Sequence, residues 1–533
     1  MKTIRWDDAW RSELFTRIEQ KYDLIIIGGG ITGAGIFRSA VSAGLKTLLL
    51  EASDFAFGTS SRSSKLVHGG FRYLYNKQYQ VTYESVTERQ RLLKEAPALI
   101  DPLPFNLPNY AAYNFPSWLF QVGLATYDLM AASWNHRALS YEQMQQSIPG
   151  LSPQGFLKGF RYYDAILDDA RLVFRIIRES VQDGGTALNY AKVINLLRDA
   201  HGNVCGVVMQ DMARGRQGIC EIPAKVVINA AGPWGDEIRS DLNAIRKIRP
   251  LRGSHIILSG SRLPVSEAVT FFHPRDKRAM FIIPWEGTTM VGTTDIDHSG
   301  SNFQPGLEPF AAAAEIDYIL EGISTLFPDS GISHEDILST FSGLRPVIDS
   351  GAATPSKESR AHQVWVEDGL VTVSGGKLTT FRIMARDTLD LASQVLGQRI
   401  KVDRRLPLIQ PINRRQLQSL TAPKRRLFGR SGQEANIIIN QSSSADLGPI
   451  NGLPALWAEL KYAASAEAIM RLDDLLLRRT RIGMLLPMGG RELMPKIRSA
   501  VQHELGWSHQ RWQHEQAHYL EIWHKYYSPN PGE

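Results

Sequence analysis

The sequence predicts an α/β protein with a parallel sheet in its first domain. An apolar run at 24–27, rich in β-branched residues, is typical of a buried parallel strand. It leads into the pattern G-x-G-x-x-G at Gly28, Gly30 and Gly33. A helical segment and a second apolar strand follow, and that strand ends in Glu51. This order of elements within about 30 residues predicts a Rossmann-like dinucleotide-binding unit.

The glycines and the acid indicate the kind of ligand. Glycines permit a tight turn and a close approach of the backbone to a pyrophosphate, at which the next helix points its N-terminus. An acid about 20 residues further on is placed to accept hydrogen bonds from a ribose, and it disfavours a 2′-phosphate. FAD or NAD is therefore favoured over NADP. The alternative is a tight turn between strand and helix that binds nothing.

The composition limits the class of protein. With 533 residues, the chain is long enough for two or three domains, and 43% hydrophobic and 21% charged residues are typical of a folded globular protein. The two cysteines, Cys205 and Cys220, exclude a disulfide framework and fit a reducing compartment. The 13 histidines include no H-E-x-x-H or H-x-H pair, so no metal site is predicted.

The hydropathy and the charge bear on membranes and partners. The start of the chain has no apolar core of signal-peptide length, and no window offers about 20 uncharged apolar residues, so no spanning helix is predicted. The net charge is +6 and the isoelectric point is near 9.1. A basic balance suits nucleic acid, an anionic membrane or an anionic substrate, and it equally suits a plain solvated surface.

The segment 55–74 is dense in Ser, Thr and Gly, which indicates a loop. Thr59, Ser60 and Ser64 offer hydroxyl groups, and Lys65 offers a charge. Because the loop directly follows the strand whose C-terminal end should face a cofactor, we expect it to bind the ligand. A polar surface loop is the alternative.

The rest of the chain alternates between strand and helix patterns. Helices are expected at 77–100, 162–185 and 456–485, strands at 190–197, 204–210 and from 225 into a glycine turn, and an antiparallel sheet within 249–347. At 370–385 a strand runs into Gly375 and Gly376 and then a helix, with Lys377 at the helix start. A second junction of this kind can bring N–H dipoles to the other end of the same cofactor.

Two segments are open to two interpretations each. The apolar run at 115–132 is too short to span a bilayer, and it is either a buried helix or a surface helix that dips into a membrane. The stretch 401–430 contains nine Lys or Arg and one acid. One interpretation is that this stretch contacts a membrane surface or a partner. The other, which we favour, is that it is a solvated face.

The run from Gly28 through T-S-S-R-S-S-K-L-V-H-G-G-F-R-Y-L resembles the FAD-dependent glycerol-3-phosphate dehydrogenases, flavoproteins that reduce a quinone. Segments at 253–255, 292–295 and 342–346 match the family, as do E-L-K-Y and L-D-D-x-L-x-R-R-T near the C-terminus. The resemblance covers roughly residues 20–510. The chain departs mildly from the family pattern in the helix at 38–43, where positions pack rather than react, and at Arg62 within the serine run.

The resemblance implies three structural parts. These are a Rossmann-like FAD-binding domain, an antiparallel-sheet substrate domain like that of amino-acid oxidases, and a C-terminal helical domain. After a lead-in at 1–21, the FAD-binding domain is expected at about 22–80, 160–250 and 340–400. The substrate domain would take about 81–159 and 251–339, and the helical domain would take 401–533.

The resemblance also implies a substrate site formed by Arg72, Tyr73, His255, Arg345 and Lys377. A phosphate dianion accepts bidentate guanidinium contacts, which suits Arg72 and Arg345, and Tyr73 would add its hydroxyl. Neutral imidazole operates near pH 7, so His255 is the natural proton acceptor. Lys377 could stabilise negative charge on the reduced flavin or on the substrate oxygen. Whether His255, Lys377 or an arginine takes the proton is left open.

The residues expected to contact FAD come from the glycine turn, the Ser/Thr loop and two later glycine junctions. They are Gly28, Gly30, Gly33, Glu51, Thr59, Ser60, Ser64, Lys65, Gly232 and Lys377.

The function that the resemblance implies is the oxidation of sn-glycerol 3-phosphate to dihydroxyacetone phosphate by hydride transfer to FAD. Electrons would pass to a membrane quinone, with the enzyme bound peripherally to the cytoplasmic face of the cell membrane; a homodimer is left open. One alternative is an oxidase that uses oxygen, or a relative acting on another phosphorylated polyol. The alternative from another class of protein is a non-redox flavoprotein that binds RNA through 401–430. The motifs that match the family's substrate side would have no role in such a protein, so no nucleic-acid partner is predicted.

Overall fold

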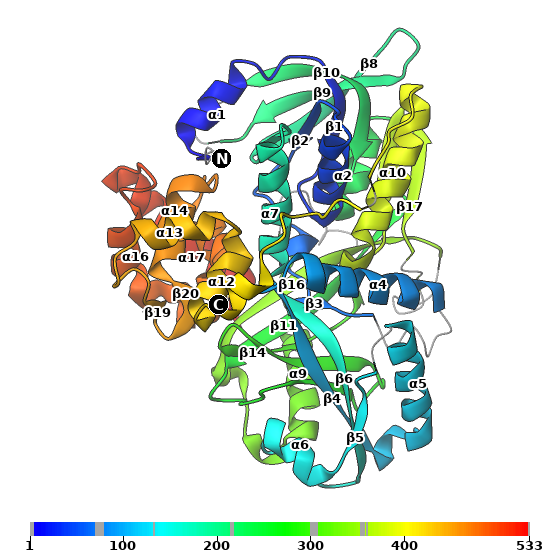
Figure 1. The fold of residues 1–533 in the computed structure, drawn as a ribbon, viewed down its shortest axis with the longest axis vertical. Helices are drawn as coiled ribbons and strands as arrows, with labels where there is room; N and C mark the ends of the chain where they lie inside the picture. The colour runs from blue at the N-terminus through cyan, green and yellow to red at the C-terminus, as the bar shows by residue number, and fades with distance from the viewer. Residues whose placement is uncertain are drawn as a thin grey trace.

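The computed structural model describes residues 5–69, 79–131, 134–213, 218–298, 308–351, 358, 361–403 and 405–530. Figure 1 shows three parts: a parallel sheet with its helices at the top, a large mixed sheet at the bottom, and a helical part on the left that touches both. The fold class predicted from the sequence is confirmed.

The upper sheet has the strand order β17-β18-β10-β1-β2-β7. Its strands are β1 (Tyr22–Ile27), β2 (Thr47–Leu50), β7 (Thr186–Leu188), β10 (Ile219–Asn229), β17 (Gln363–Glu367) and β18 (Leu370–Ser374). All neighbours are parallel except β17 and β18. Strands from three distant segments therefore end at one edge, and the predicted strands at 24–27 and 46–50 form the centre of this sheet.

The upper sheet is covered on both faces. On one face lie α2 (Ile31–Ser42), α7 (Asp169–Gln182) and α10 (Phe381–Leu396), whose apolar side chains share a core with β1 and β18. The other face packs against α1 (Asp8–Phe15) and the hairpin β8 (Ala191–Arg198) and β9 (Val204–Asp211), which continues into β10. Burial on both faces explains why β1 reads as a continuous apolar run.

The lower sheet has the order β15-β11-β14-β13-β12-β4-β6-β3, with β16 paired to β11 and β5 to β6. Its strands are β3 (Leu66–Val67), β4 (Ile100–Tyr110), β5 (Arg137–Leu139), β6 (Phe156–Leu167), β11 (Ile248–Ser259), β12 (Ala268–Phe272), β13 (Ala279–Trp285), β14 (Thr288–Gly292), β15 (Ile296–Asp297) and β16 (Ile337–Ile348). The pairs are antiparallel apart from β12 and β4. The antiparallel sheet expected within 249–347 is confirmed.

Helices surround the lower sheet. They are α4 (Tyr79–Glu95), α5 (Ser117–Met130), α6 (Tyr141–Ser147) and α9 (Ala313–Leu326). The helix expected at 77–100 is confirmed as α4. The helix expected at 162–185 is wrong in its first part: residues up to Leu167 belong to β6, because they pair with β4, and α7 begins at Asp169. Asp168 starts that helix by accepting a hydrogen bond from the backbone N–H of Arg171 at 3.2 Å.

The C-terminal part is helical, as predicted for 456–485. It contains α11 (Arg414–Gln418), α12 (Ala422–Ser431), α13 (Glu434–Gln441), α14 (Trp457–Ala466), a π-helical turn at Asp474–Arg479, α15 (Ile482–Leu485), α16 (Met494–Val501) and α17 (His509–Tyr527), with a small hairpin of β19 (Pro449–Ile450) and β20 (Leu453–Leu456). Its apolar side chains form one core with those of the lower sheet, including Trp285 and Phe341.

The basic stretch at 401–430 is only partly a solvated face. Arg405, Arg415 and Arg425 are exposed. Arg426, however, pairs with Glu286 at 2.8 Å and with Glu459 at 2.5 Å. Arg430 is also buried, so two of these charges join the helical part to its neighbours instead of facing solvent.

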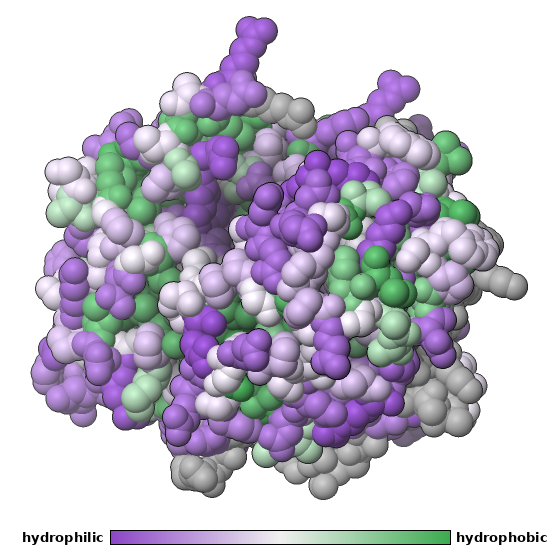
Figure 2. Space-filling model, turned by 90° about the horizontal axis from the view of Figure 1, so that it is seen from below, coloured by the Kyte–Doolittle hydropathy of each residue, from purple (hydrophilic) through white to green (hydrophobic). Residues whose placement is uncertain are grey.

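The apolar run at 115–132 forms α5, a helix on the surface. Phe120, Leu124 and Tyr127 pack inward, whereas the side of the helix that carries Trp118 and Leu129 is exposed, at 64% and 77%. The interpretation of this run as a buried helix is therefore wrong, because one side of α5 is exposed; contact of that side with a membrane stays a prediction. Seen from below the view of Figure 1, hydrophobic patches on the surface alternate with hydrophilic ones (Figure 2).

Candidate active site

The turn between β1 and α2 is closed so tightly that only glycine fits. Gly28 has φ +111°, and a Cβ there would lie 2.5 Å from the carbonyl oxygen of Ala230. A Cβ on Gly33 would lie 1.9 Å from the carbonyl oxygen of Gly28. Gly30 precedes α2, and the Ser60 hydroxyl accepts a hydrogen bond from the N–H of Ile31 at 2.9 Å. The first turn of α2 and the Ser/Thr loop therefore meet at the glycine pattern.

Glu51 lies directly beside this turn. Its carboxylate accepts hydrogen bonds from the N–H groups of Gly29 at 2.7 Å and Ser53 at 2.9 Å. Burial raises the pKa of Glu51, and these two N–H groups oppose that shift. The acid at the end of β2 and the glycines on β1 thus form one cradle, which is the arrangement that holds the pyrophosphate and ribose of a dinucleotide.

Two further junctions lie at the same edge of the upper sheet. β10 ends before Gly232, which has φ +58° and no atom within 4 Å of a Cβ placed there. β18 ends before Gly375 and Gly376, which have φ +82° and +74°, and Lys377 follows them. Because β1, β10 and β18 are parallel neighbours, their carboxyl ends face one crevice.

The crevice carries buried donors that suit a polar cofactor. Within the described part of the chain, the Ser374 hydroxyl and the Trp234 indole N–H are buried and have no hydrogen-bond partner. Ser374 is the last residue of β18, and Trp234 follows Gly232. Unsatisfied buried donors are costly, so a ligand with acceptor atoms is expected here. The glycine cradle, Glu51 and these donors together fit FAD.

His255 is positioned by β11 on the side of the crevice that faces the lower sheet. It is 2% exposed, its Nε2 lies 2.9 Å from the Ser64 hydroxyl, and its ring stacks on Phe341 with 4.7 Å between the ring centres. Gly292 gives the ring room, since a Cβ there would lie 2.3 Å from the imidazole. Burial lowers the pKa of His255 well below its usual value, and the charges of Lys65 and Arg345 lower it further. The imidazole is therefore neutral at pH 7.

Arg345 extends from β16, next to β11. Its guanidinium donates to Asp295 at 2.5 Å and to the Thr293 hydroxyl at 3.4 Å, and a quarter of its side chain is exposed. Gly253 leaves the room for it, because a Cβ there would lie 2.5 Å from an Arg345 nitrogen. Arg278 also binds Asp295, at 3.0 Å. Two guanidinium groups on one carboxylate leave a net positive charge that suits an anionic substrate.

The Ser/Thr loop is fixed by internal contacts. The Thr59 hydroxyl donates to the carbonyl oxygen of Leu344. Lys65 is fully buried, and its ammonium donates to the Ser61 carbonyl at 2.6 Å and to Asp169 at 2.9 Å. Burial lowers the pKa of Lys65 to about 8, and Asp169 opposes the shift. Lys65 thus has partners inside the protein, and a direct contact of Lys65 with the cofactor stays a prediction.

Contacts in the structure join the predicted site residues into groups: Glu51 and Ser60 lie at the glycine turn, and Ser64 contacts His255. That these groups form one site stays a prediction, and Arg72 and Tyr73 lie outside the described residues. Sequence reasoning missed the contact between Ser64 and His255, which are 191 residues apart, and the role of Asp295 as the partner of Arg345. Asp295 lies in one of the segments that match the family, and this match was the sequence signal that could have indicated its role.

A third missed feature ties the loop after Glu51 to the C-terminal part. Asp54 is fully buried and accepts hydrogen bonds from Arg478 at 2.6 Å and from Arg479 at 2.7 and 2.8 Å. Asn189 also donates to Asp54, at 3.1 Å. The two arginines belong to the L-D-D-x-L-x-R-R-T motif, which sequence reasoning had treated only as a sign of the family.

Comparisons with known proteins agree with this geometry. Residues 23–391 match the model of the family described as FAD dependent oxidoreductase, and residues 410–512 match the C-terminal domain of alpha-glycerophosphate oxidase.

Among curated relatives, the aerobic glycerol-3-phosphate dehydrogenase of Staphylococcus haemolyticus is 37% identical over 389 residues, which are 72% of this chain and 69% of that protein. The Staphylococcus aureus protein of the same name is 34% identical over 493 residues, 86% of each chain.

Solved structures show the same fold. A glycerol-3-phosphate dehydrogenase from Bacillus halodurans, complexed with FAD, superposes with a TM-score of 0.76 at 29% identity and covers 98% of each chain. An L-alpha-glycerophosphate oxidase from Mycoplasma pneumoniae with FAD bound gives a TM-score of 0.54 at 16% identity, over 74% of this chain and 99% of that one. The latter likeness concerns the fold alone.

Proposed function

The chain belongs to the family of FAD-dependent glycerol-3-phosphate dehydrogenases, and from this premise we propose that it oxidises sn-glycerol 3-phosphate to dihydroxyacetone phosphate. The observation that carries the proposal is the pairing of a neutral, buried His255 with a positively charged Arg345 cluster at the crevice of an FAD cradle. Alcohol oxidation requires a hydride acceptor, which FAD would supply, a proton acceptor and a group that binds the substrate phosphate, and His255 and Arg345 are proposed for the last two.

The cofactor is FAD, and residues of this chain would hold it from two ends. Gly28, Gly30 and Gly33, with the N-terminus of α2, would bind the pyrophosphate, and Glu51 would bind the ribose. The junctions at Gly232 and at 375–377 would contact the other end. When bound, FAD supplies the hydride acceptor for the reaction.

Substrate binding is assigned to the arginines. Arg345 is held by Asp295 and a quarter of its side chain is exposed, so its planar guanidinium is the group proposed to bind the phosphate dianion. Arg72 and Tyr73 are assigned to the same phosphate from the family resemblance.

Proton transfer is assigned to His255. Its imidazole is neutral, and its Nε2 is engaged by the Ser64 hydroxyl. Among the described residues its Nδ1 is buried without a hydrogen-bond partner, so Nδ1 is the nitrogen proposed to accept the hydroxyl proton. A phosphate dianion nearby would raise the pKa of the imidazole and favour its protonated form. Lys377 would stabilise negative charge that develops at its end of the crevice.

The electron acceptor is proposed to be a membrane quinone, with peripheral binding on the cytoplasmic face. No helix among the described residues is long and apolar enough to cross a bilayer. The exposed apolar face of α5, with Trp118, Val122 and Leu129 at 64%, 55% and 77%, supports contact with one leaflet.

The test is anaerobic reduction of the flavin. Glycerol 3-phosphate added to the purified yellow protein should bleach the visible flavin band, and a soluble quinone added afterwards should restore it. Retention of the band with FAD present would refute the proposed substrate. Rapid peroxide formation in air would assign oxygen instead of quinone as the acceptor.

A further inference from the structure

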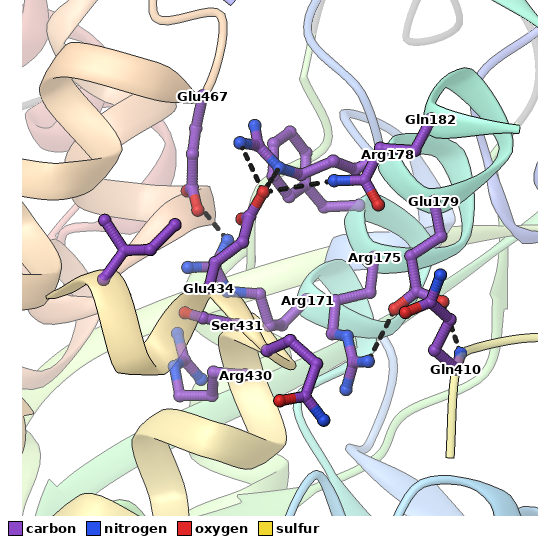
Figure 3. Close-up of a pocket in the computed structure, with 13 residues that line it drawn as sticks. Arg171, Arg175, Arg178, Glu179, Gln182, Gln410, Arg430, Ser431, Glu434 and Glu467 are labelled. Carbon is purple, nitrogen blue, oxygen red and sulfur yellow. Dashed lines mark hydrogen bonds and ion pairs between the residues drawn. The ribbon is translucent and has the colours of Figure 1, made fainter. Parts of the chain in front are cut away.

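A cavity of about 280 Å³ lies between α7 and the C-terminal helices α12 and α13. Figure 3 shows that its wall carries Arg171, Arg175 and Arg178 from α7, facing Arg430 from α12. The three α7 residues are spaced i, i+4 and i+7 and so share one face of the helix. All four are 4% exposed or less. Arginine is rarely buried this deeply, so the cluster requires an explanation.

Ion pairs explain part of the cluster. Arg171 pairs with Glu467 at 2.8 Å, Arg175 with Glu179 at 2.6 Å and Arg178 with Glu434 at 2.8 Å. Arg430 pairs with Asp168, behind the wall, at 2.6 Å. The wall itself thus carries four guanidinium groups against the three glutamates. Backbone carbonyl oxygens accept from further N–H groups of the cluster, that of Ala466 from Arg178 at 2.6 Å and that of Arg479 from Arg430 at 2.8 Å.

Donors in the wall lack partners within the protein. Among the described residues, the Ser431 hydroxyl and the Nε atoms of Arg171 and Arg430 are buried without a hydrogen-bond partner. Arg430 Nε lies 3.7 Å from Glu459, which is too long for a hydrogen bond. Ser431 is 8% exposed and lies between Arg171 and Arg430 (Figure 3). Three donors with no acceptor line one cavity, and leaving such donors unsatisfied costs free energy.

The backbone leaves space for Arg175. Gly432 has φ +58°, and a Cβ there would lie 2.9 Å from a terminal nitrogen of Arg175. Arg175 also donates to the carbonyl oxygen of Gly429 at 2.7 Å. Gln433, at the rim, is exposed, so the cavity has a way to solvent.

We propose that this cavity is a second anion site, which binds a small phosphate-bearing metabolite or inorganic phosphate at the joint between the FAD-binding and helical parts. Guanidinium groups in a planar fork match phosphate oxygens, and the unpartnered serine hydroxyl adds a neutral donor. The volume lies at the small end of ligand pockets, which suits a short phosphate ester and excludes a nucleotide.

The site has a physical connection to the reaction centre. Arg430 holds Asp168, the cap residue of α7, and the next residue, Asp169, binds Lys65 and the N–H of Ser63 at 3.0 Å. These residues flank Ser64, the partner of His255. An anion at the cavity therefore acts on a chain of contacts that ends at the active-site loop, and its binding does not depend on the identity of the substrate.

The test is amide hydrogen exchange of the FAD-loaded, full-length enzyme in millimolar inorganic phosphate, compared with chloride of equal ionic strength. Exchange at 171–182 and 429–434 should slow severalfold. The double variant Arg175→Gln, Glu179→Gln removes an ion pair without leaving a lone buried charge, and it should lose the effect. The matched control Glu13→Gln, Arg17→Gln removes an exposed pair of the same residue types, also spaced i and i+4, and should keep it.

Ser431→Ala provides an independent variant in case the double variant does not fold. Losing one hydrogen bond to a charged ligand should raise the phosphate concentration for half-maximal protection about tenfold. No protection in the wild type, equal protection in the double variant, or unchanged half-saturation in Ser431→Ala would each overturn the proposal. Bleaching by glycerol 3-phosphate is measured separately, so failure here leaves the proposed activity standing.

Discussion

His255 combines deep burial with a hydrogen bond to Ser64 and two positive neighbours, Lys65 and Arg345. Its pKa is lowered in the fold, so the unfolded chain takes up this proton first as the pH falls. Stability should therefore decrease as the pH falls below about 6.5, the usual histidine pKa.

The variant His255→Gln should remove this contribution. Between pH 6.5 and 5.5, the wild type should lose about 1 kcal/mol more free energy of unfolding than the variant, as follows for one site protonated only in the unfolded chain. Urea unfolding at the two pH values measures the difference. Equal losses in both proteins would mean that His255 is protonated in the native state.

Arg345 is the described residue that we propose to hold the substrate phosphate. Replacing it by lysine keeps the charge but removes the planar pair of donors that Asp295 orients. Loss of a charge-assisted hydrogen bond costs about 1.5–3 kcal/mol, so Arg345→Lys should raise KM about ten- to a hundredfold. The flavin content should not change.

Arg262→Lys serves as the control for Arg345→Lys. Arg262 lies in the same sheet region and pairs with Asp336 at 2.6 Å, but it is 35% exposed and away from the crevice. The KM of the Arg262→Lys variant should equal that of the wild type. A similar rise of KM in both variants would indicate a general effect on the lower sheet instead of a lost phosphate contact.

At the scale of elements, the turn between β1 and α2 depends on contacts that no side chain tolerates. Gly33→Ala places a Cβ 1.9 Å from the Gly28 carbonyl and should give protein without flavin, measured as the ratio of flavin to protein absorbance. Gly44→Ala, at the end of the same helix, has φ +80° but open space, so it should cost about 1–2 kcal/mol and keep the flavin. Full flavin occupancy in Gly33→Ala would show that the glycine turn is not part of the FAD site.

The exposed face of α5 permits a test of membrane contact. Val122→Ser, Leu129→Ser should reduce co-sedimentation with vesicles containing anionic lipid, because about 0.8 kcal/mol is lost for each CH₂ group no longer buried. Ile245→Ser, at a residue 84% exposed elsewhere, is the matched control and should bind like the wild type. Equal loss in both variants would exclude α5 as the contact.

The elements that sequence patterns predicted are those with a local cause. β1, α2 and β2 follow from a continuous apolar run, a glycine pattern and helical periodicity. β4 was missed because Pro102, Pro104 and Pro108 argue against a strand. The three prolines are spaced by even numbers of residues, so the backbone N–H groups that they lack would all point to the same side of β4. On the other hand, β12 pairs with β4 only at Phe105 and Asn106, so that pairing is short.

The site was predictable only where its residues are close in sequence or belong to a motif. Glu51 and the glycines meet because a βαβ unit places them together. The contact between Ser64 and His255 joins the loop after β2 to β11, and it arises from tertiary packing that periodicity does not encode. The same holds for Asp54 and Arg479, which are 425 residues apart.

At the scale of the whole molecule, the helical part is joined to the FAD cradle through buried charges. Asp54, Asp473 and Asp474 surround Arg478 and Arg479, so three carboxylates share two guanidinium groups. The excess of one negative charge in a buried cluster favours protonation of one acid. Burial, with Asp54 and Asp473 nearby, raises the pKa of Asp474 to about 7, while the two arginines hold the pKa of Asp54 below its usual value.

This cluster should make the joint sensitive to pH near neutrality. Since the folded pKa of Asp474 lies above its unfolded value, the native state holds a proton that the unfolded chain has lost, and this stabilisation disappears as the pH rises through about 7. Between pH 6 and 8, the wild type should lose about 1.4 kcal/mol from this group.

Asp474→Asn stays neutral at every pH and should remove that loss, leaving the variant relatively more stable at pH 8. Thermal unfolding and FAD retention should both be measured at pH 6 and pH 8. Thermal unfolding reports on the stability of the protein, and FAD retention reports on the glycine turn, because Asp54, which binds Arg478, follows Glu51 closely in the chain. Asp183→Asn, whose partly exposed carboxylate pairs with Arg38 at the end of α7, is the control and should keep the wild-type pH dependence. If Asp474→Asn instead lost stability equally at both pH values, the carboxyl would be ionised in the native state, and another acid of the cluster would hold the proton.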